Sequence, residues 1–288
     1  RLCRAHVQGR DLARGHDAAV GRDLPASIQL RESGERVPVL DFDLAGREAR
    51  VFGLVTGHSV ACAALRLLER QGRKPGETRV LLQGFGTVGG AAALYMARSG
   101  IRIVGITDAT SALLRPEGLT ADDVESLLLK RTGNTLPAVE DLLEGPDSHA
   151  RFWKQPADVF VAAAGSGSLD AGRLDQLEAA GVTSIVSGAN HPFWASEPGD
   201  TALEQQADER FAVIADVIAS CGTAHAFACQ AKSDMPLRPE EVFDSIRETV
   251  EAAVDEAIRR CGSVETGLLS GALELALDRC GPAARNEP

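Results

Sequence analysis

Short apolar runs alternate with amphipathic segments along most of this 288-residue chain. Segment 59–70 has apolar residues at helical spacing and is followed by Gly72, which is typical of a helix that ends there. Five apolar runs beyond it predict strands, and they cover residues 78–85, 101–108, 157–165, 183–190 and 211–219. Segments 87–100, 119–130 and 168–181 lie between these runs and predict helices, the second of which Thr120 can cap.

Strands that are apolar throughout and are separated by helices predict a parallel sheet covered on both faces. The fold class is therefore α/β, with a doubly wound, Rossmann-like sheet. Segments 240–260 and 266–279 follow with helical spacing and no strand signal, which predicts helices at the C-terminal end. Residues 1–45 are polar, Arg-rich and weakly periodic, and indicate loops with one strand.

Composition excludes several classes of protein. With 44% hydrophobic and 25% charged residues, the chain is typical of soluble globular proteins. Its formal charge of −11 repels nucleic acid and anionic lipid, so neither is an expected partner. The six cysteines form no C-x-x-C pair, which disfavours a zinc site and favours a reduced, cytoplasmic compartment. No apolar run approaches the ~20 residues needed to cross a bilayer, and no signal peptide is visible. Because the chain starts with Arg1, we expect the natural start to lie upstream.

The strongest local signal is a G-x-G-x-x-G turn between the first predicted strand and the helix after it. Gly84 permits a tight turn, Gly86 lets the backbone approach a diphosphate, and Gly89 lets the helix pack close to the strand. The helix N-terminus beyond Thr87 offers free N–H groups and a positive dipole end to the phosphates. The expected cofactor contacts are Gly84, Phe85, Gly86, Thr87, Val88 and Gly89. The alternative is a glycine turn that binds no nucleotide.

An acidic residue, Asp108, ends the second predicted strand. At this position a carboxylate can accept both hydroxyls of the adenosine ribose, and it repels a 2′-phosphate, which favours NAD over NADP. Arg102 and Arg115 are near in sequence and could soften that preference, so NADP stays an alternative.

Four motifs, the first of which contains the glycine turn, carry a resemblance to a known family. Segment 79–124, with RVLLQGFGTVGG and IRIVGITDATSALLRPEGL, resembles the cofactor domain of the glutamate/leucine/phenylalanine/valine dehydrogenases. The likeness continues in PADVFVAAAGSGSL, IVSGANHPF and IADVIASCGTAHAF, and spans about residue 43 to the C-terminus. It implies NAD(P)-dependent oxidative deamination of an L-amino acid, or reductive amination of a 2-oxo acid. It also implies that Thr56 and Asn190 contact the nicotinamide end and that Ala164 and Gly165 approach the cofactor. The alternative for each is a loop residue selected for its turn geometry.

Two departures from the family pattern concern the substrate. Ser220-Cys221-Gly222-Thr223 stands where the family usually has Asn-Ala-Gly-Gly. The resemblance implies that Phe227, with Ala224 before it, faces the substrate side chain. A bulky apolar group would leave a γ-carboxylate unpaired, so we expect an apolar, aromatic or unusual amino acid rather than glutamate. The alternative is that Phe227 faces the core.

The catalytic set implied by the family is incomplete in this chain. Asp11 loosely matches the family's proton-transfer carboxylate, with Asp17 and Asp23 as rivals. The glycine-flanked lysine segment has no counterpart. We therefore expect a remnant of a substrate domain over residues 1–45, a dinucleotide-binding domain over 46–236, and helices packing back toward the substrate domain over 237–288.

Three functional hypotheses follow. The first is a fragment of an intact amino-acid dehydrogenase, in a family where homo-oligomers are usual. The second is a degenerate member that binds a dinucleotide without turning over amino acids. The third is an NAD-dependent enzyme of another class, such as a 2-hydroxy-acid dehydrogenase, which the order of the motifs does not favour.

Overall fold

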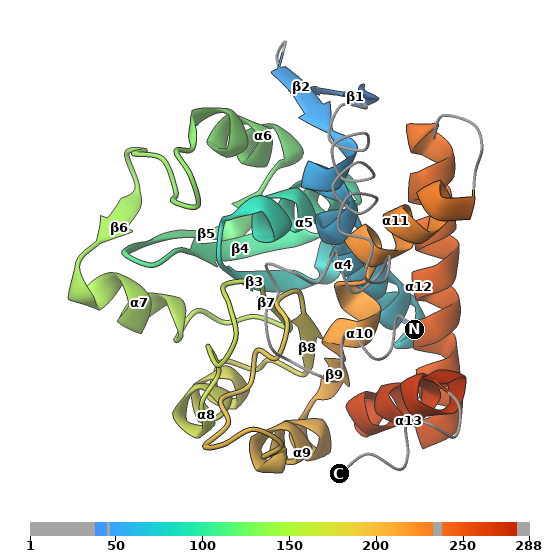
Figure 1. The fold of residues 1–288 in the computed structure, drawn as a ribbon. Coiled ribbons are helices and arrows are strands. Elements are labelled where there is room, and N and C mark those ends of the chain that lie inside the picture. Colours follow the sequence, from blue (N-terminus) through green and yellow to red (C-terminus); the bar gives the residue numbers. More distant parts are fainter. Residues whose placement is uncertain (1–37, 45–46, 233–237, 281–288) are drawn as a thin grey trace.

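The computed structural model describes residues 38–44, 47–232 and 238–280. Its centre is a seven-stranded sheet with the strand order β6-β5-β4-β3-β7-β8-β9 (Figure 1). The strands are β3 (Arg79–Gln83), β4 (Arg102–Thr107), β5 (Ser111–Leu119), β6 (Leu142–Glu144), β7 (Val159–Ala162), β8 (Ser184–Ser187) and β9 (Ala212–Ile214). A separate antiparallel pair is formed by β1 (Pro38–Leu44) and β2 (Arg47–Arg50).

The five predicted strands are all present and run parallel to one another. Strands β7 and β8 are buried along their whole length, as expected for a sheet covered on both faces. The fifth run was predicted too long, because β9 ends at Ile214 and a short helix, α10 (Asp216–Ala219), follows. A short apolar run does not distinguish a buried strand from a buried helix, so periodicity alone could not divide it.

The sheet is mixed at one edge, where the sequence predicted no strands. Strand β5 pairs antiparallel with β4, and β6 pairs antiparallel with β5. Pro116 and Gly118 interrupt the apolar pattern of β5, and β6 has only three residues, so neither gives a strand signal. The edge extends the sheet beside β4 and brings segment 108–111 next to β6.

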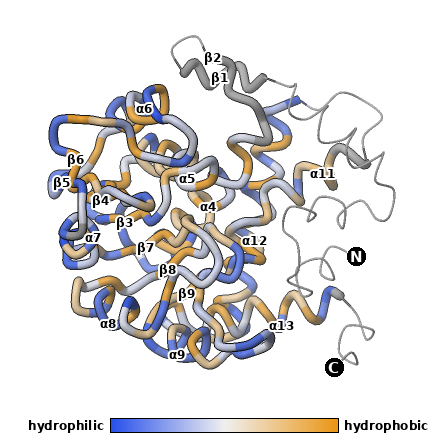
Figure 2. Tube along the Cα trace, turned by 60° about the vertical axis from the view of Figure 1, so that its left-hand side comes forward, coloured by the Kyte–Doolittle hydropathy of each residue, from blue (hydrophilic) through white to orange (hydrophobic). Residues whose placement is uncertain are grey.

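Helices cover both faces of the sheet. Strand β4 lies on one side of β3 and β7 and β8 on the other, so right-handed crossovers place α5 (Thr87–Arg98) and α8 (Ala171–Ala179) on opposite faces (Figure 1). Hydrophobic residues are concentrated along the central strands in Figure 2. The remaining elements are α4 (Val51–Arg70), η2 (Pro75–Glu77), α6 (Ala121–Lys130), α7 (Pro146–Phe152), α9 (Ala202–Arg210), α11 (Gly222–Lys232), α12 (Pro239–Cys261) and α13 (Leu268–Cys280). The predicted cap of α6 is confirmed, since the Thr120 hydroxyl accepts a hydrogen bond from the Asp123 amide.

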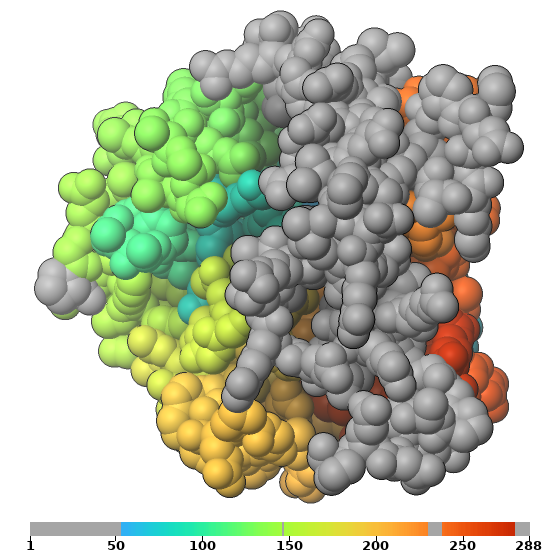
Figure 3. Space-filling model, in the orientation of Figure 1, coloured from blue at the N-terminus to red at the C-terminus, as the bar shows by residue number. Residues whose placement is uncertain are grey.

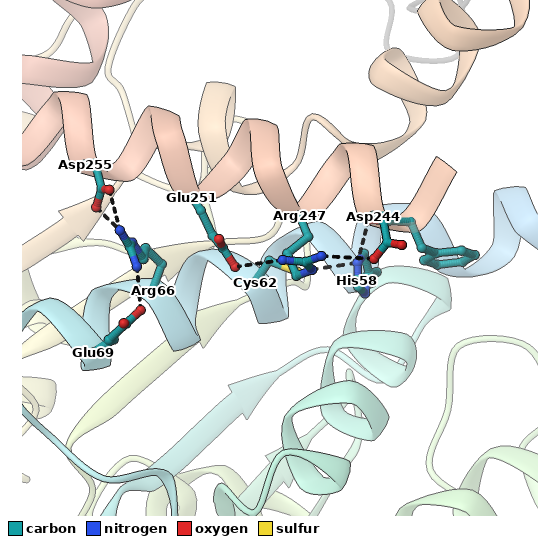
Figure 4. A network of polar contacts seen from close by, with 9 residues as sticks. His58, Cys62, Arg66, Glu69, Asp244, Arg247, Glu251 and Asp255 are labelled. Atoms are coloured by element: carbon teal, nitrogen blue, oxygen red, sulfur yellow. Dashed lines mark hydrogen bonds and ion pairs between the residues drawn. The ribbon is translucent and has the colours of Figure 1, made fainter. Parts of the chain in front are cut away.

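Helix α4 lies between α5 and α12 and joins the C-terminal helices to the sheet. Arg66 of α4 forms an ion pair with Asp255 of α12 (Figure 4). The His58 ring packs edge-on against Tyr95 of α5 and Phe243 of α12, at centroid distances of 4.7 and 4.9 Å. Helix α13 packs against α9 and β9. In the described residues, therefore, the C-terminal helices share one core with the Rossmann-like sheet.

Candidate functional site

The glycine turn follows β3 at the carboxyl edge of the sheet. Gly84 has φ +98°, and a Cβ at this position would lie 2.5 Å from the carbonyl oxygen of Ala163. A Cβ on Gly89 would lie 1.9 Å from the carbonyl oxygen of Gly84. Both positions exclude any side chain, so the turn folds back on itself and lies directly against the loop after β7.

The turn leaves the start of α5 open toward solvent. Gly86 is the N-cap, and no side chain caps the helix. Thr87 is exposed, whereas the Phe85 side chain is fully buried and anchors the turn in the core. A Cβ on Gly86 would meet only the side chain of Asn134, whose oxygen would be 3.0 Å away. Uncapped N–H groups at the positive end of a 12-residue helix, beside a glycine without a side chain, fit the diphosphate of a dinucleotide.

A loop that the sequence did not single out, residues 131–136, lies over this turn. Arg131 Nη1 donates hydrogen bonds to the carbonyl oxygens of Gly86 (2.6 Å) and Phe85 (3.2 Å). The Leu136 amide donates to Asp108 Oδ2 at 2.6 Å. Helix α6 and this loop are at the surface in Figure 3, in green. No motif identifies these residues, because only the fold brings them to the turn.

Asp108 lies at the end of β4 as predicted, but its carboxylate is largely engaged by the protein. Oδ1 accepts from the amides of Thr110 and Ser111, both at 2.8 Å, and from the Ser111 hydroxyl at 2.9 Å. Burial raises its pKa, but the hydrogen bonds from Thr110, Leu136 and Ser111 outweigh this, so the pKa of Asp108 is below its ordinary value. A carboxylate has about four acceptor positions, so this arrangement leaves room for one ribose hydroxyl at Oδ2 rather than two.

The two arginines considered as modifiers of cofactor preference lie elsewhere. Arg102 begins β4 at the opposite edge of the sheet, where it donates to the carbonyl oxygens of Pro116 and Glu117. Arg115 forms an ion pair with Asp141. Both guanidinium groups are thus engaged by other groups, and these contacts give no support to the expectation that the arginines soften the preference for NAD.

Loops after β7 and β8 complete the carboxyl edge. Ala164 and Gly165 follow β7, and the Cα of Ala164 lies 2.8 Å from the position that a Gly84 Cβ would take. The Ser166 hydroxyl donates to the backbone oxygen of Asn190 at 2.8 Å. The Ser220 hydroxyl lies 3.1 Å from Asn190 Oδ1. The structure therefore brings together the predicted residues of the turn, of the loop after β7 and of the loop after β8.

Thr56 is held beside α11 by polar contacts. Its hydroxyl is 2.7 Å from the Thr223 hydroxyl. The Ser59 hydroxyl, which is fully buried, donates to the Thr56 and Ala219 carbonyls and accepts from the Gly222 amide at 3.2 Å. A Cβ on Gly222 would lie 2.1 Å from the carbonyl oxygen of Val55, so α11 begins in direct backbone contact with α4.

The structure describes the predicted substrate residues but not the predicted catalytic ones. The side chain of Phe227 is 1% exposed, which favours the core-facing alternative, while Ala224 is half-buried. Asp11, Asp17 and Asp23 lie outside the described residues.

Other classes of site find little support in the described part of the chain. It holds no group of three His, Cys, Asp or Glu side chains able to bind a metal. It also has no helix long and apolar enough to cross a membrane. Lys74 pairs with Glu77 before β3, at the edge of the sheet opposite the turn.

Comparisons with known proteins agree with this geometry. A sequence model of the family described as glutamate/leucine/phenylalanine/valine dehydrogenase matches residues 51–287. The NAD-specific glutamate dehydrogenase of Staphylococcus aureus (strain COL) is 28% identical over 233 residues, which are 80% of this chain and 53% of that protein. Among solved structures, the hetero-hexameric glutamate dehydrogenase from Thermus thermophilus (Leu bound form) is similar with a TM-score of 0.62 and 28% identity, over 80% of this chain and 52% of that one.

A further structure supports the fold alone. The L-tryptophan dehydrogenase from Nostoc punctiforme is similar with a TM-score of 0.53 and 15% identity, over 81% of this chain and 60% of that one. The chain spans about half the length of the curated relatives that it matches.

Proposed function

Because the chain belongs to the glutamate/leucine/phenylalanine/valine dehydrogenase family, we propose that it is the dinucleotide-binding portion of an NAD(P)-dependent amino-acid dehydrogenase. The observation that carries this proposal is the glycine turn before the uncapped N-terminus of α5. The turn lies at the carboxyl edge between β4 and β7, where the strand order changes direction, and ligands of open α/β sheets bind at such a point.

Each predicted contact has a defined task in this proposal. The first-turn amides of α5 bind the diphosphate, and Oδ2 of Asp108 accepts a ribose hydroxyl. Thr56 and Asn190 orient the carboxamide of the nicotinamide, with Ala164 and Gly165 bordering the ring. The bound nicotinamide supplies the hydride acceptor, while the protein supplies its position. The ionised Asp108 would repel a 2′-phosphate, so we propose NAD as the preferred cofactor.

The substrate side of the proposal rests on fewer contacts. Asp11 is our candidate for the proton-transfer group, and Ala224 for a contact to the substrate side chain. Because Phe227 is buried in the core, the preference for an apolar amino acid over glutamate stays an expectation from the sequence. Within the longer protein, a homo-oligomer is the expected assembly.

Titration with NADH, followed by nucleotide fluorescence, tests the proposal directly. We expect saturable binding, and Gly86→Ala should abolish it while leaving the fold intact, because the new methyl group meets only the Asn134 side chain and no backbone atom. Gly76→Ala is the matched control, since a Cβ there has no neighbour closer than 4.0 Å. Absence of NADH binding by the unsubstituted protein would refute the proposal.

A panel of amino acids assayed with NAD at alkaline pH tests whether the protein is an active dehydrogenase or a degenerate member that only binds the dinucleotide. The panel requires the protein with its upstream coding sequence. NADH formation with an apolar amino acid supports the dehydrogenase. Tight NADH binding without NADH formation on any amino acid supports the binding module.

A further inference from the structure

Arg131, at the C-terminal end of α6, places a cation beside the start of α5. A Cβ on Gly90, in the first turn of α5, would lie 3.0 Å from Arg131 Nη1. The same nitrogen donates to the carbonyls of Phe85 and Gly86, the two central residues of the turn. The guanidinium is thus in contact with the segment whose amides form the anion site.

The charge of Arg131 is not neutralised by the protein. Within residues 47–232 and 238–280, its hydrogen bonds go only to these two carbonyl oxygens, and no carboxylate lies within ion-pair distance of it. Its Nε and Nη2 atoms keep their donors free in the same part of the chain. Partial burial lowers the pKa of Arg131, which shows the cost of holding this charge without an anion.

The loop after Arg131 reaches the site at two further points. The Asn134 side chain lies beside Gly86, and the Leu136 amide donates to Asp108. Loop 131–136 therefore spans from the diphosphate position to the ribose position. An exposed surface arginine would search many rotamers, whereas this one is oriented in advance.

We propose that Arg131 is a direct ligand of the dinucleotide diphosphate, contacting it through the donors that the protein leaves free. The inference rests on the proposed function and adds to it a charged contact beyond the backbone amides. A guanidinium presents a planar set of donors that matches phosphate oxygens, and it remains charged at all working pH values. The diphosphate supplies the counter-charge that the protein lacks.

Three variants test the proposal: Arg131→Met removes charge and donors, Arg131→Lys keeps the charge, and Lys130→Met is the control. Lys130 is the exposed neighbouring residue, so its loss changes the net charge equally. Dissociation constants are measured for NADH, for ADP, and for adenosine by competition with NADH. We expect Arg131→Met to weaken NADH and ADP binding about tenfold, which is about 1.4 kcal/mol, because it removes charge-assisted hydrogen bonds to the phosphates. Adenosine, which has no phosphate, should bind equally to all four proteins.

The dependence of affinity on salt distinguishes a charged contact from a structural one. Between about 50 and about 500 mM NaCl, ADP affinity should fall less steeply for Arg131→Met than for the unsubstituted protein, with Arg131→Lys close to the latter. Equal ADP affinity of Arg131→Met and the unsubstituted protein overturns the inference. So does an equal loss of ADP and adenosine binding, because it would mean that Arg131 only shapes the turn. If the unsubstituted protein binds neither NADH nor ADP, the proposed function itself has failed.

Discussion

Gly57 lies at a close contact between α4 and α5, and Gly57→Ala tests how tightly these two helices are packed beside the site. A Cβ on Gly57 would lie 2.4 Å from Cβ of Ala91, 2.5 Å from the amide nitrogen of Ala92 and 2.7 Å from the carbonyl oxygen of Val88. Two of these three atoms belong to the α5 backbone and cannot rotate away. To restore ordinary contact at about 3.5 Å, the helices must separate by about 1 Å.

The magnitude follows from two opposing effects. Alanine gains about 1 kcal/mol over glycine inside a helix. Overpacking costs about 1–3 kcal/mol, and rigid backbone neighbours put this position at the upper end. We expect a net destabilisation of about 2 kcal/mol. Because Val88 belongs to the first turn of α5, the same displacement should move the diphosphate-binding amides and weaken NADH binding.

Gly53→Ala is the matched control in the same helix. No atom lies within 4 Å of a Cβ at Gly53, so only the propensity gain remains, and we expect about 0.5–1 kcal/mol of stabilisation. Urea unfolding followed by circular dichroism measures both variants. With a slope of about 3 kcal/mol per molar, their midpoints should differ by about 1 M. If both variants are stabilised, the close approach of α4 and α5 is not as the structure has it.

Three further predictions concern buried polar groups. Ser59→Ala should cost about 2–3 kcal/mol of unfolding free energy, because the buried amide of Gly222 loses its partner; a change below about 0.5 kcal/mol in urea contradicts this. Asp208→Ala should cost about 2 kcal/mol by removing the acceptor of the Leu269 amide at the start of α13, whereas Asp208→Asn should retain part of it. Burial lowers the pKa of His58 from its ordinary 6.5, so its contribution to stability is present above pH 6.5 and is lost as the pH falls through the folded-state pKa. His58→Gln should therefore flatten the fall in urea midpoint between about pH 7 and pH 5, and an unchanged slope would refute this.

Much of the fold could be predicted because its signals are local. The parallel strands are continuous apolar runs, α5 and α8 have helical spacing, and Thr120 with Asp123 forms a capping pair three residues apart. Strands β5 and β6 could not be predicted in the same way. Their place in the sheet depends on pairing with β4, and Pro116 and Gly118 remove the pattern that an isolated strand would show.

The residues of the candidate site also differ in whether a local sequence signal could predict them. The glycine turn and Asp108 are recognisable because their spacing is fixed within one β-α-β unit. Arg131 was missed because its hydrogen-bond partners, Phe85 and Gly86, are 46 and 45 residues away and no spacing rule connects them. The internal hydrogen bonds of Asp108 were missed for a related reason, since the Leu136 amide reaches it only through loop 131–136.

The departures from the family pattern at Ser220 and Thr223 bear on whether the chain is degenerate. In the sequence, it is the departures at Ser220 and Phe227 that lend weight to a degenerate member. In the structure, the Ser220 hydroxyl contacts Asn190 Oδ1, and the Thr223 hydroxyl contacts that of Thr56. Asn190 and Thr56 are the two proposed carboxamide contacts, so each substituted residue contacts one of them. The Ser220 hydroxyl also lies 2.9 Å from the Asp216 carbonyl oxygen, so its one hydrogen has two nearby acceptors. These hydrogen bonds support the proposal that dinucleotide binding is retained, which an active dehydrogenase and the degenerate member would share, so the amino-acid panel is the measurement that distinguishes the two.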